Sequence, residues 1–119
     1  MIKQILLVGA GGAVGSIMRF LTSEVTTRYC SLTFPLATFI INILGCLGIG
    51  LLVNLIPSGN NLRFLLIIGF CGGFTTFSTF ARETFDLIEL NQMPLAFVYT
   101  MSSCILGVCA VWLGMYITK

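Results

Sequence analysis

The sequence predicts an all-α integral membrane protein with four transmembrane helices, and three observations support this prediction. Only 8% of the 119 residues are charged, against about 25% in an average soluble domain. Apolar residues make up 57% of the chain, which leaves too few polar side chains to cover a water-soluble domain. The charges are also widely spaced, with none between Arg28 and Arg63 and none between Glu89 and Lys119. Each gap can hold a helix that crosses about 30 Å of hydrocarbon.

The first span is predicted over residues 4–23. A cleavable signal peptide is the alternative here, because Lys3 precedes an apolar run that small residues follow. We favour a retained span, since no A-x-A cleavage site precedes Arg19 and the rest of the chain is equally hydrophobic. Gly11 and Gly15 are spaced so that a second helix can approach closely in lipid. A dinucleotide-binding G-x-G-x-x-G motif is excluded, because Val14 occupies the position of its last glycine.

The other three spans follow from the turn signals between them. The second span is predicted over 35–56 and ends at the turn Pro57–Asn61. The third covers 63–90, and its second half carries charged residues that belong in the membrane interface. The fourth covers 94–117, with Pro94 placed to begin a helix. Residues 1–119 are therefore expected to form one four-helix transmembrane domain.

The positive charges give almost no bias in orientation. Four spans place Lys3, Arg63 and Lys119 on one side, whereas Arg19, Arg28 and Arg82 belong to the opposite half. Two interpretations are open: charges that face inward do not count, or the chain inserts in both orientations and pairs with its inverted copy. A four-helix unit of this length is too thin to enclose a polar pathway alone, which favours a dimer.

Catalytic and zinc chemistry are disfavoured by the residue types present. The chain has five Cys and no His, and no two Cys form a C-x-x-C pair. Four of the five Cys fall inside predicted spans, where they are expected to pack between helices. No nucleophile with a neighbouring base is evident, so we expect a protein that is not an enzyme.

Two polar residues inside the spans allow both structural and functional roles. Asn42 lies in the second span, where its amide either joins helices or offers N–H donors to a passing ligand. Arg19 lies near the end of the first span, where it either extends to the membrane interface or attracts anions in a vestibule.

The segment Gly69–Phe80 predicts an interruption of the third helix near residues 72–79. Two adjacent Gly and two adjacent Thr are poor helix formers, and its hydroxyl groups are costly in hydrocarbon. Irregular backbone at this depth is tolerated where it lines a polar cavity, and its free carbonyls are natural cation ligands. Phe77 and Phe80 share a helix face, and their ring edges carry positive quadrupole density that could hold a small anion.

Three segments of the sequence together resemble the signature blocks of the Fluc (CrcB) family of fluoride channels. These are Gly12–Arg19, Thr38–Gly45, and Gly69–Phe80 followed by Glu83. The resemblance implies an antiparallel, dual-topology homodimer of four-helix subunits in the bacterial inner membrane. It implies two pathways that export fluoride passively and so reduce its toxicity in the cytoplasm. The implied partners are fluoride, lipid and a second copy of the chain, with no nucleic acid.

The resemblance also implies roles for individual residues. Asn42 would be the pore amide, with Phe77 and Phe80 as an aromatic box for fluoride. The remaining assignments are hydroxyls from Ser78 and Thr79, a polar track on the last helix at Tyr99 and Ser103, charged positions at Arg19 and Glu83, and a structural Na⁺ at the dimer centre held by the backbone carbonyls of Gly72 and Thr75. Gly107 interrupts the polar track, and Arg82 stands where a small residue is commoner.

Two other functions are alternatives to fluoride transport. A small multidrug transporter is also a four-span, dual-topology dimer, but it depends on a carboxylate in the middle of the first span. Residues 4–18 contain no Asp or Glu. A non-transporting membrane assembly subunit would leave the polarity of Gly72–Phe80 unexplained.

Overall fold

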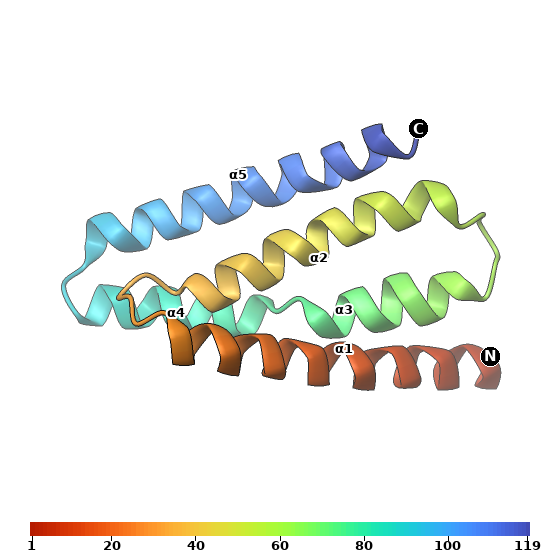
Figure 1. Cartoon of the computed structure of the whole chain (residues 1–119), viewed down its shortest axis with the longest axis horizontal. Coiled ribbons are helices and arrows are strands. Elements are labelled where there is room, and N and C mark those ends of the chain that lie inside the picture. The colour runs from red at the N-terminus through yellow and green to blue at the C-terminus, as the bar shows by residue number, and fades with distance from the viewer.

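Four long apolar helical segments, each able to cross a membrane by length and composition, make up the chain and confirm the predicted fold class. The computed structural model describes all residues, 1–119. The elements, shown in Figure 1, are α1 (Ile2–Tyr29), α2 (Leu36–Leu55), the interrupted third segment of η1 (Arg63–Cys71), α3 (Gly72–Phe74) and α4 (Phe77–Glu89), and α5 (Met93–Ile117).

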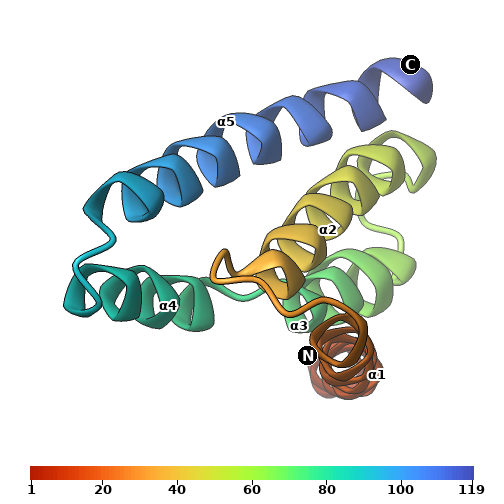
Figure 2. The same cartoon turned by 60° about the vertical axis from the view of Figure 1, so that its left-hand side comes forward.

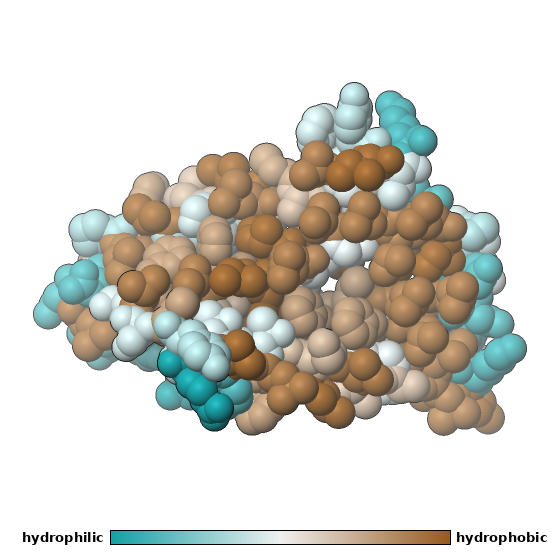
Figure 3. Space-filling model, in the orientation of Figure 1, coloured by the Kyte–Doolittle hydropathy of each residue, from teal (hydrophilic) through white to brown (hydrophobic).

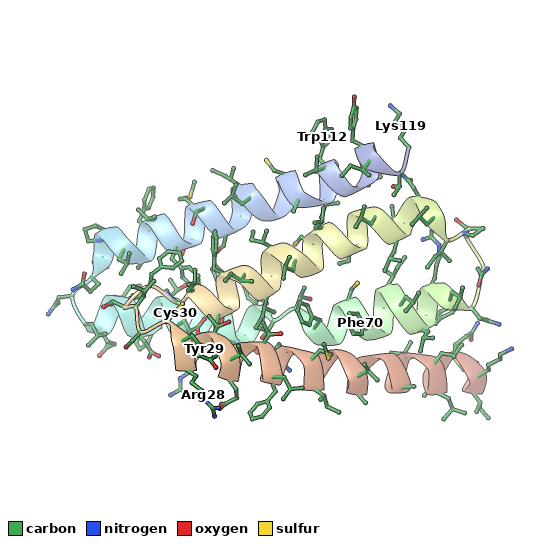
Figure 4. The ribbon with its side chains drawn as sticks, viewed as in Figure 1. Arg28, Tyr29, Cys30, Phe70, Trp112 and Lys119 are labelled. Carbon is green, nitrogen blue, oxygen red and sulfur yellow. The ribbon has the colours of Figure 1, made fainter.

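The helices associate in two main pairs. The most extensive contacts join α1 to η1 and α3, and α2 to α5. Figure 2 shows α4 turning away from α1 toward the beginning of α5, so the third segment contacts α1 with its first half and α5 with its second. Both termini lie at one end of the bundle together with the turn after α2 (Figure 1). Arg28 and Lys119 accordingly lie at opposite ends (Figure 4).

The outer surface of the bundle suits a lipid environment. Figure 3 shows apolar residues over the middle of the molecule and hydrophilic residues gathered toward its ends. Large apolar side chains such as those of Leu6, Phe97 and Trp112 are exposed on this surface. In a soluble protein such a continuous apolar surface would lead to aggregation, whereas in a membrane it contacts acyl chains.

The first helix continues to Tyr29, past its predicted end at residue 23. The prediction covers only the length needed to cross the hydrocarbon. Polar residues do not end a helix, however, and the Thr22 hydroxyl donates a hydrogen bond to the Met18 carbonyl at 2.8 Å. The helix stops only where Cys30 adopts an extended conformation.

The interruption of the third segment is narrower than predicted. Only Thr75 and Thr76 have extended backbone (φ −79°, ψ 157° and φ −148°, ψ 121°). Before them η1 is π-helical, and the N–H of Gly72 donates to the carbonyl of Ile67, five residues earlier. After them α4 begins at once, because the Thr76 hydroxyl caps it by accepting the N–H of Thr79 at 3.3 Å.

Glycines allow α1 to lie directly against the backbone of the third segment. A Cβ atom on Gly15 would lie 2.2 Å from the Phe70 carbonyl oxygen, and one on Gly73 would lie 2.6 Å from the Gly12 carbonyl oxygen. Neither contact can be relieved by a rotamer change, because the opposing atoms belong to the backbone. The small-residue face predicted for α1 is therefore the surface on which α1 packs.

Gly15→Ala is expected to destabilise the protein strongly, by about 1–3 kcal/mol or more, because α1 must move away from the third segment. The measurement is the unfolding temperature in detergent. Gly9→Ala is the matched control in the same helix, since its Cβ would meet nothing within 4 Å. Equal unfolding temperatures for the two variants would contradict the close packing of α1.

Candidate functional site

A groove at the interruption of the third segment brings together five of the residues singled out from the sequence, Asn42, Thr75, Phe77, Phe80 and Ser103. Its volume is about 290 Å³. Four elements contribute to it: α2, the extended residues of the interruption, the start of α4, and the middle of α5. The residues that line it are Asn42, Cys46, Ile49, Thr75, Thr76, Phe77, Phe80, Ser103 and Cys104.

Asn42 holds the extended backbone in place from α2. Its Nδ2 donates to the Thr76 carbonyl at 3.0 Å, and its Oδ1 accepts the Thr76 N–H at 2.8 Å. The amide thus replaces the hydrogen bonds that a continuous helix would make at Thr76. Because a carboxamide has two N–H groups, one donor remains after this pairing. The helix-joining role considered for Asn42 is observed, and a donor is still left for a ligand.

Phe77 and Phe80 lie next to each other on the first turn of α4. Their ring centroids are 5.9 Å apart and the rings are tilted by 49°. Phe80 also packs against Tyr99, with 5.0 Å between ring centroids. Phe77 contacts little within this chain, since it is 78% exposed. Phe80 is therefore anchored in the bundle, whereas Phe77 projects from it.

The last helix contributes Ser103 to the groove but does not contribute Tyr99. The Ser103 hydroxyl oxygen is buried without a hydrogen-bond partner. Buried hydroxyl groups without a partner are rare in native structures. Tyr99 is fully buried and its hydroxyl donates to Glu83 at 3.0 Å. Gly107 packs against α2, where a Cβ would lie 3.5 Å from the Cys46 sulfur.

Ser78 and Thr79 lie beside the two phenylalanines in α4, but neither lines the groove. Ser78 is exposed and Thr79 is partly buried. The Thr79 backbone N–H is used in capping α4.

Arg19 contacts the interruption from α1. Its Nε donates to the Gly73 carbonyl at 3.1 Å. In a continuous helix this carbonyl would accept a hydrogen bond from the N–H of Phe77. Phe77 lies beyond the interruption, so the carbonyl needs another partner. Arg19 therefore supplies the hydrogen bond that the interruption leaves unmade at Gly73. It does not line the groove.

The carbonyls of Gly72 and Thr75 fit a hard cation. The N–H of Thr76, which would bind the Gly72 carbonyl in a continuous helix, donates to Asn42 instead. Thr75 has extended backbone, so its carbonyl also lies outside the helical hydrogen-bond ladder. Oxygen donors of this kind are preferred by Na⁺.

Sequence reasoning missed four lining residues, Cys46, Ile49, Thr76 and Cys104. Helical spacing would have found two of them, because residues 42, 46 and 49 follow the i, i+4, i+7 pattern of one helix face. The Cys residues inside the spans were expected only to pack between helices. Cys46 and Cys104 line the groove.

The interrupted helix, its clamp by an amide and the polar groove beside it define a multi-pass membrane protein of the channel or transporter class. Sequence comparison agrees. The profile of a family described as CrcB-like protein, Camphor Resistance (CrcB), matches residues 6–115. The chain belongs to this family, and the resemblance noted from the sequence is confirmed.

Proteins that are named as fluoride-specific ion channels match this chain over nearly their full length. The chain is 45% identical to the fluoride-specific ion channel FluC of Flavobacterium psychrophilum, over 98% of both chains. It is 42% identical to the protein of the same name from Azobacteroides pseudotrichonymphae, over 100% of this chain and 98% of the relative. The corresponding protein of Phocaeicola vulgatus is 41% identical, over 98% of this chain and 99% of the relative.

Proposed function

We propose that this protein is a fluoride-selective channel that exports fluoride passively across the bacterial inner membrane. The similar proteins named fluoride-specific ion channels support this function. The single observation that carries it is the composition of the groove. Its polar side chains carry one amide, three hydroxyls and two thiols, its walls include two tilted phenyl rings, and no charged side chain lines it.

The groove can replace the hydration of a small anion without binding it too tightly. The free N–H of Asn42 and the unpartnered hydroxyl of Ser103 are hydrogen-bond donors at the groove. The ring edges of Phe77 and Phe80 add weaker electrostatic stabilisation. A fixed positive charge would hold fluoride too strongly, whereas conduction requires binding that permits release.

The conducting form is proposed to be an antiparallel homodimer. Phe77 is 78% exposed although it lines the groove, so a second subunit that covers it would complete the wall. The nearly balanced positive charge of the two ends is consistent with insertion in both orientations. A structural Na⁺ at the centre would be held by the carbonyls of Gly72 and Thr75, which lack their helical partners.

Purified protein in liposomes should release trapped fluoride rapidly and retain chloride. Fluoride and chloride electrodes measure the two effluxes from matched vesicles, with valinomycin to carry the balancing K⁺. Empty liposomes serve as the control. Efflux of fluoride no faster than from empty vesicles, or equal efflux of both anions, would contradict the proposed function.

A further inference from the structure

A second polar cavity lies at the end of the bundle opposite the termini. Its volume is about 210 Å³. It lies between the last turns of α1, the connection from α1 to α2, and Glu83 of α4. It shares no lining residue with the groove, and Glu83 is the only one of the candidate site residues from the sequence that lines it.

Hydroxyl groups gather along one side of this cavity. Ser23, Thr26 and Thr27 follow i, i+3, i+4 spacing, which places them on one face of α1, and Ser31 follows in the connection. None of these four hydroxyls forms a hydrogen bond within the protein, in contrast to that of Thr22 in the same helix. The cavity is thus lined by four hydroxyl-bearing residues without protein partners.

Glu83 supplies the only charge among the lining residues, and no positive side chain balances it. One carboxylate oxygen accepts the Tyr99 hydroxyl at 3.0 Å. Three basic side chains of this half of the molecule have other partners or point elsewhere. Arg82 lies 3.9 Å from the Asp86 carboxylate, Arg19 binds the Gly73 carbonyl, and Arg28 points away from the connection (Figure 4).

We propose that this cavity binds an alkali cation, Na⁺ or K⁺, between the Glu83 carboxylate and the α1 hydroxyls. Carboxylate and hydroxyl oxygens are the donors that hard cations prefer. One carboxylate among neutral hydroxyls balances a single positive charge, and a partly buried carboxylate without a counter-charge is unfavourable. An anion would meet the negative Glu83 and no positive group. This site differs from the proposed central Na⁺ site, which uses backbone carbonyls, and it does not depend on fluoride conduction.

Crystals of the full-length protein soaked in Tl⁺, an alkali-cation surrogate with strong anomalous scattering, test the site directly. We expect an anomalous peak beside Glu83 in the wild type and in Asp86→Asn, whose carboxylate lies outside the cavity. Glu83→Gln should lose the peak, although its amide oxygen can still accept the Tyr99 hydroxyl. Absence of the peak in the wild type, or its persistence in Glu83→Gln, overturns the proposal.

Unfolding temperature in detergent gives a second readout. Replacing N-methylglucamine chloride with KCl should raise the unfolding temperature of the wild type and of Asp86→Asn by a few degrees more than that of Glu83→Gln. Thr27→Val, which keeps the side-chain shape and removes one hydroxyl, should show an intermediate shift. Because all four proteins retain the carbonyls of Gly72 and Thr75, cation binding there cancels in the comparison. Equal shifts in all four overturn the proposal.

Discussion

Replacing Phe77 with isoleucine is expected to lower fluoride efflux at least tenfold without loss of folding. Isoleucine retains an apolar side chain but has no ring edge, so the desolvated anion loses an electrostatic contact at the groove. A tenfold effect corresponds to about 1.4 kcal/mol. Because Phe77 is 78% exposed within this chain, its replacement removes little internal packing. Efflux from liposomes and the elution volume in gel filtration measure the two properties separately.

Phe80→Ile and Phe20→Ile complete this experiment. Phe80→Ile should also lower efflux, and it should reduce stability somewhat because the ring contact with Tyr99 is lost. Phe20 is 61% exposed on α1, away from the groove, so Phe20→Ile should conduct normally. If Phe77→Ile conducts as fast as Phe20→Ile, the aromatic assignment is wrong.

Asn42→Ala is expected to abolish conduction and to destabilise the protein. The substitution leaves both the N–H and the carbonyl of Thr76 without their partner, and each unsatisfied buried group costs about 1–3 kcal/mol. The extended backbone at the interruption would then lose the contact that fixes it, and Phe77, the next residue, would lose its position. The donor proposed to face fluoride is removed as well.

Two further variants separate these effects. Asn42→Asp retains an acceptor for the Thr76 N–H but adds negative charge to the groove, so we expect partial recovery of stability and no recovery of efflux. Asn54→Ala is the matched control, because Asn54 lies in the same helix and donates one exposed hydrogen bond to Met115. Full efflux from Asn42→Ala would show that the amide is not part of the pathway.

The membrane fold was predictable because charge is so expensive in hydrocarbon that its absence marks each span. Helix type and exact ends were not predictable by this means. The hydropathy of Arg63–Cys71 does not distinguish an α-helix from the π-helix observed. The pair Gly72 and Gly73 suggested a break, yet both are helical in the structure, where Gly73 provides close contact with α1.

Parts of the candidate site were predictable for a different reason. Asn42, Phe77 and Phe80 drew attention because they interrupt apolar sequence or repeat within one turn. Thr76 was predicted only as one of two adjacent Thr that disfavour a helix, because its contribution to the site lies in backbone atoms that Asn42 binds. The contact from Arg19 to Gly73 joins residues far apart in the sequence. No local pattern reveals a contact of that kind.

The pairing of the helices has a consequence for how the chain matures as it leaves the ribosome. The extensive contacts join the first span to the third and the second span to the fourth, so neighbouring spans do not form the main pairs. A nascent chain that has delivered only α1 and α2 to the membrane has neither main pair. The second pair waits for α5, the last helix to be synthesised. Chains truncated before α5 should therefore remain open, accessible to membrane proteases, and dependent on the insertion machinery until synthesis is complete.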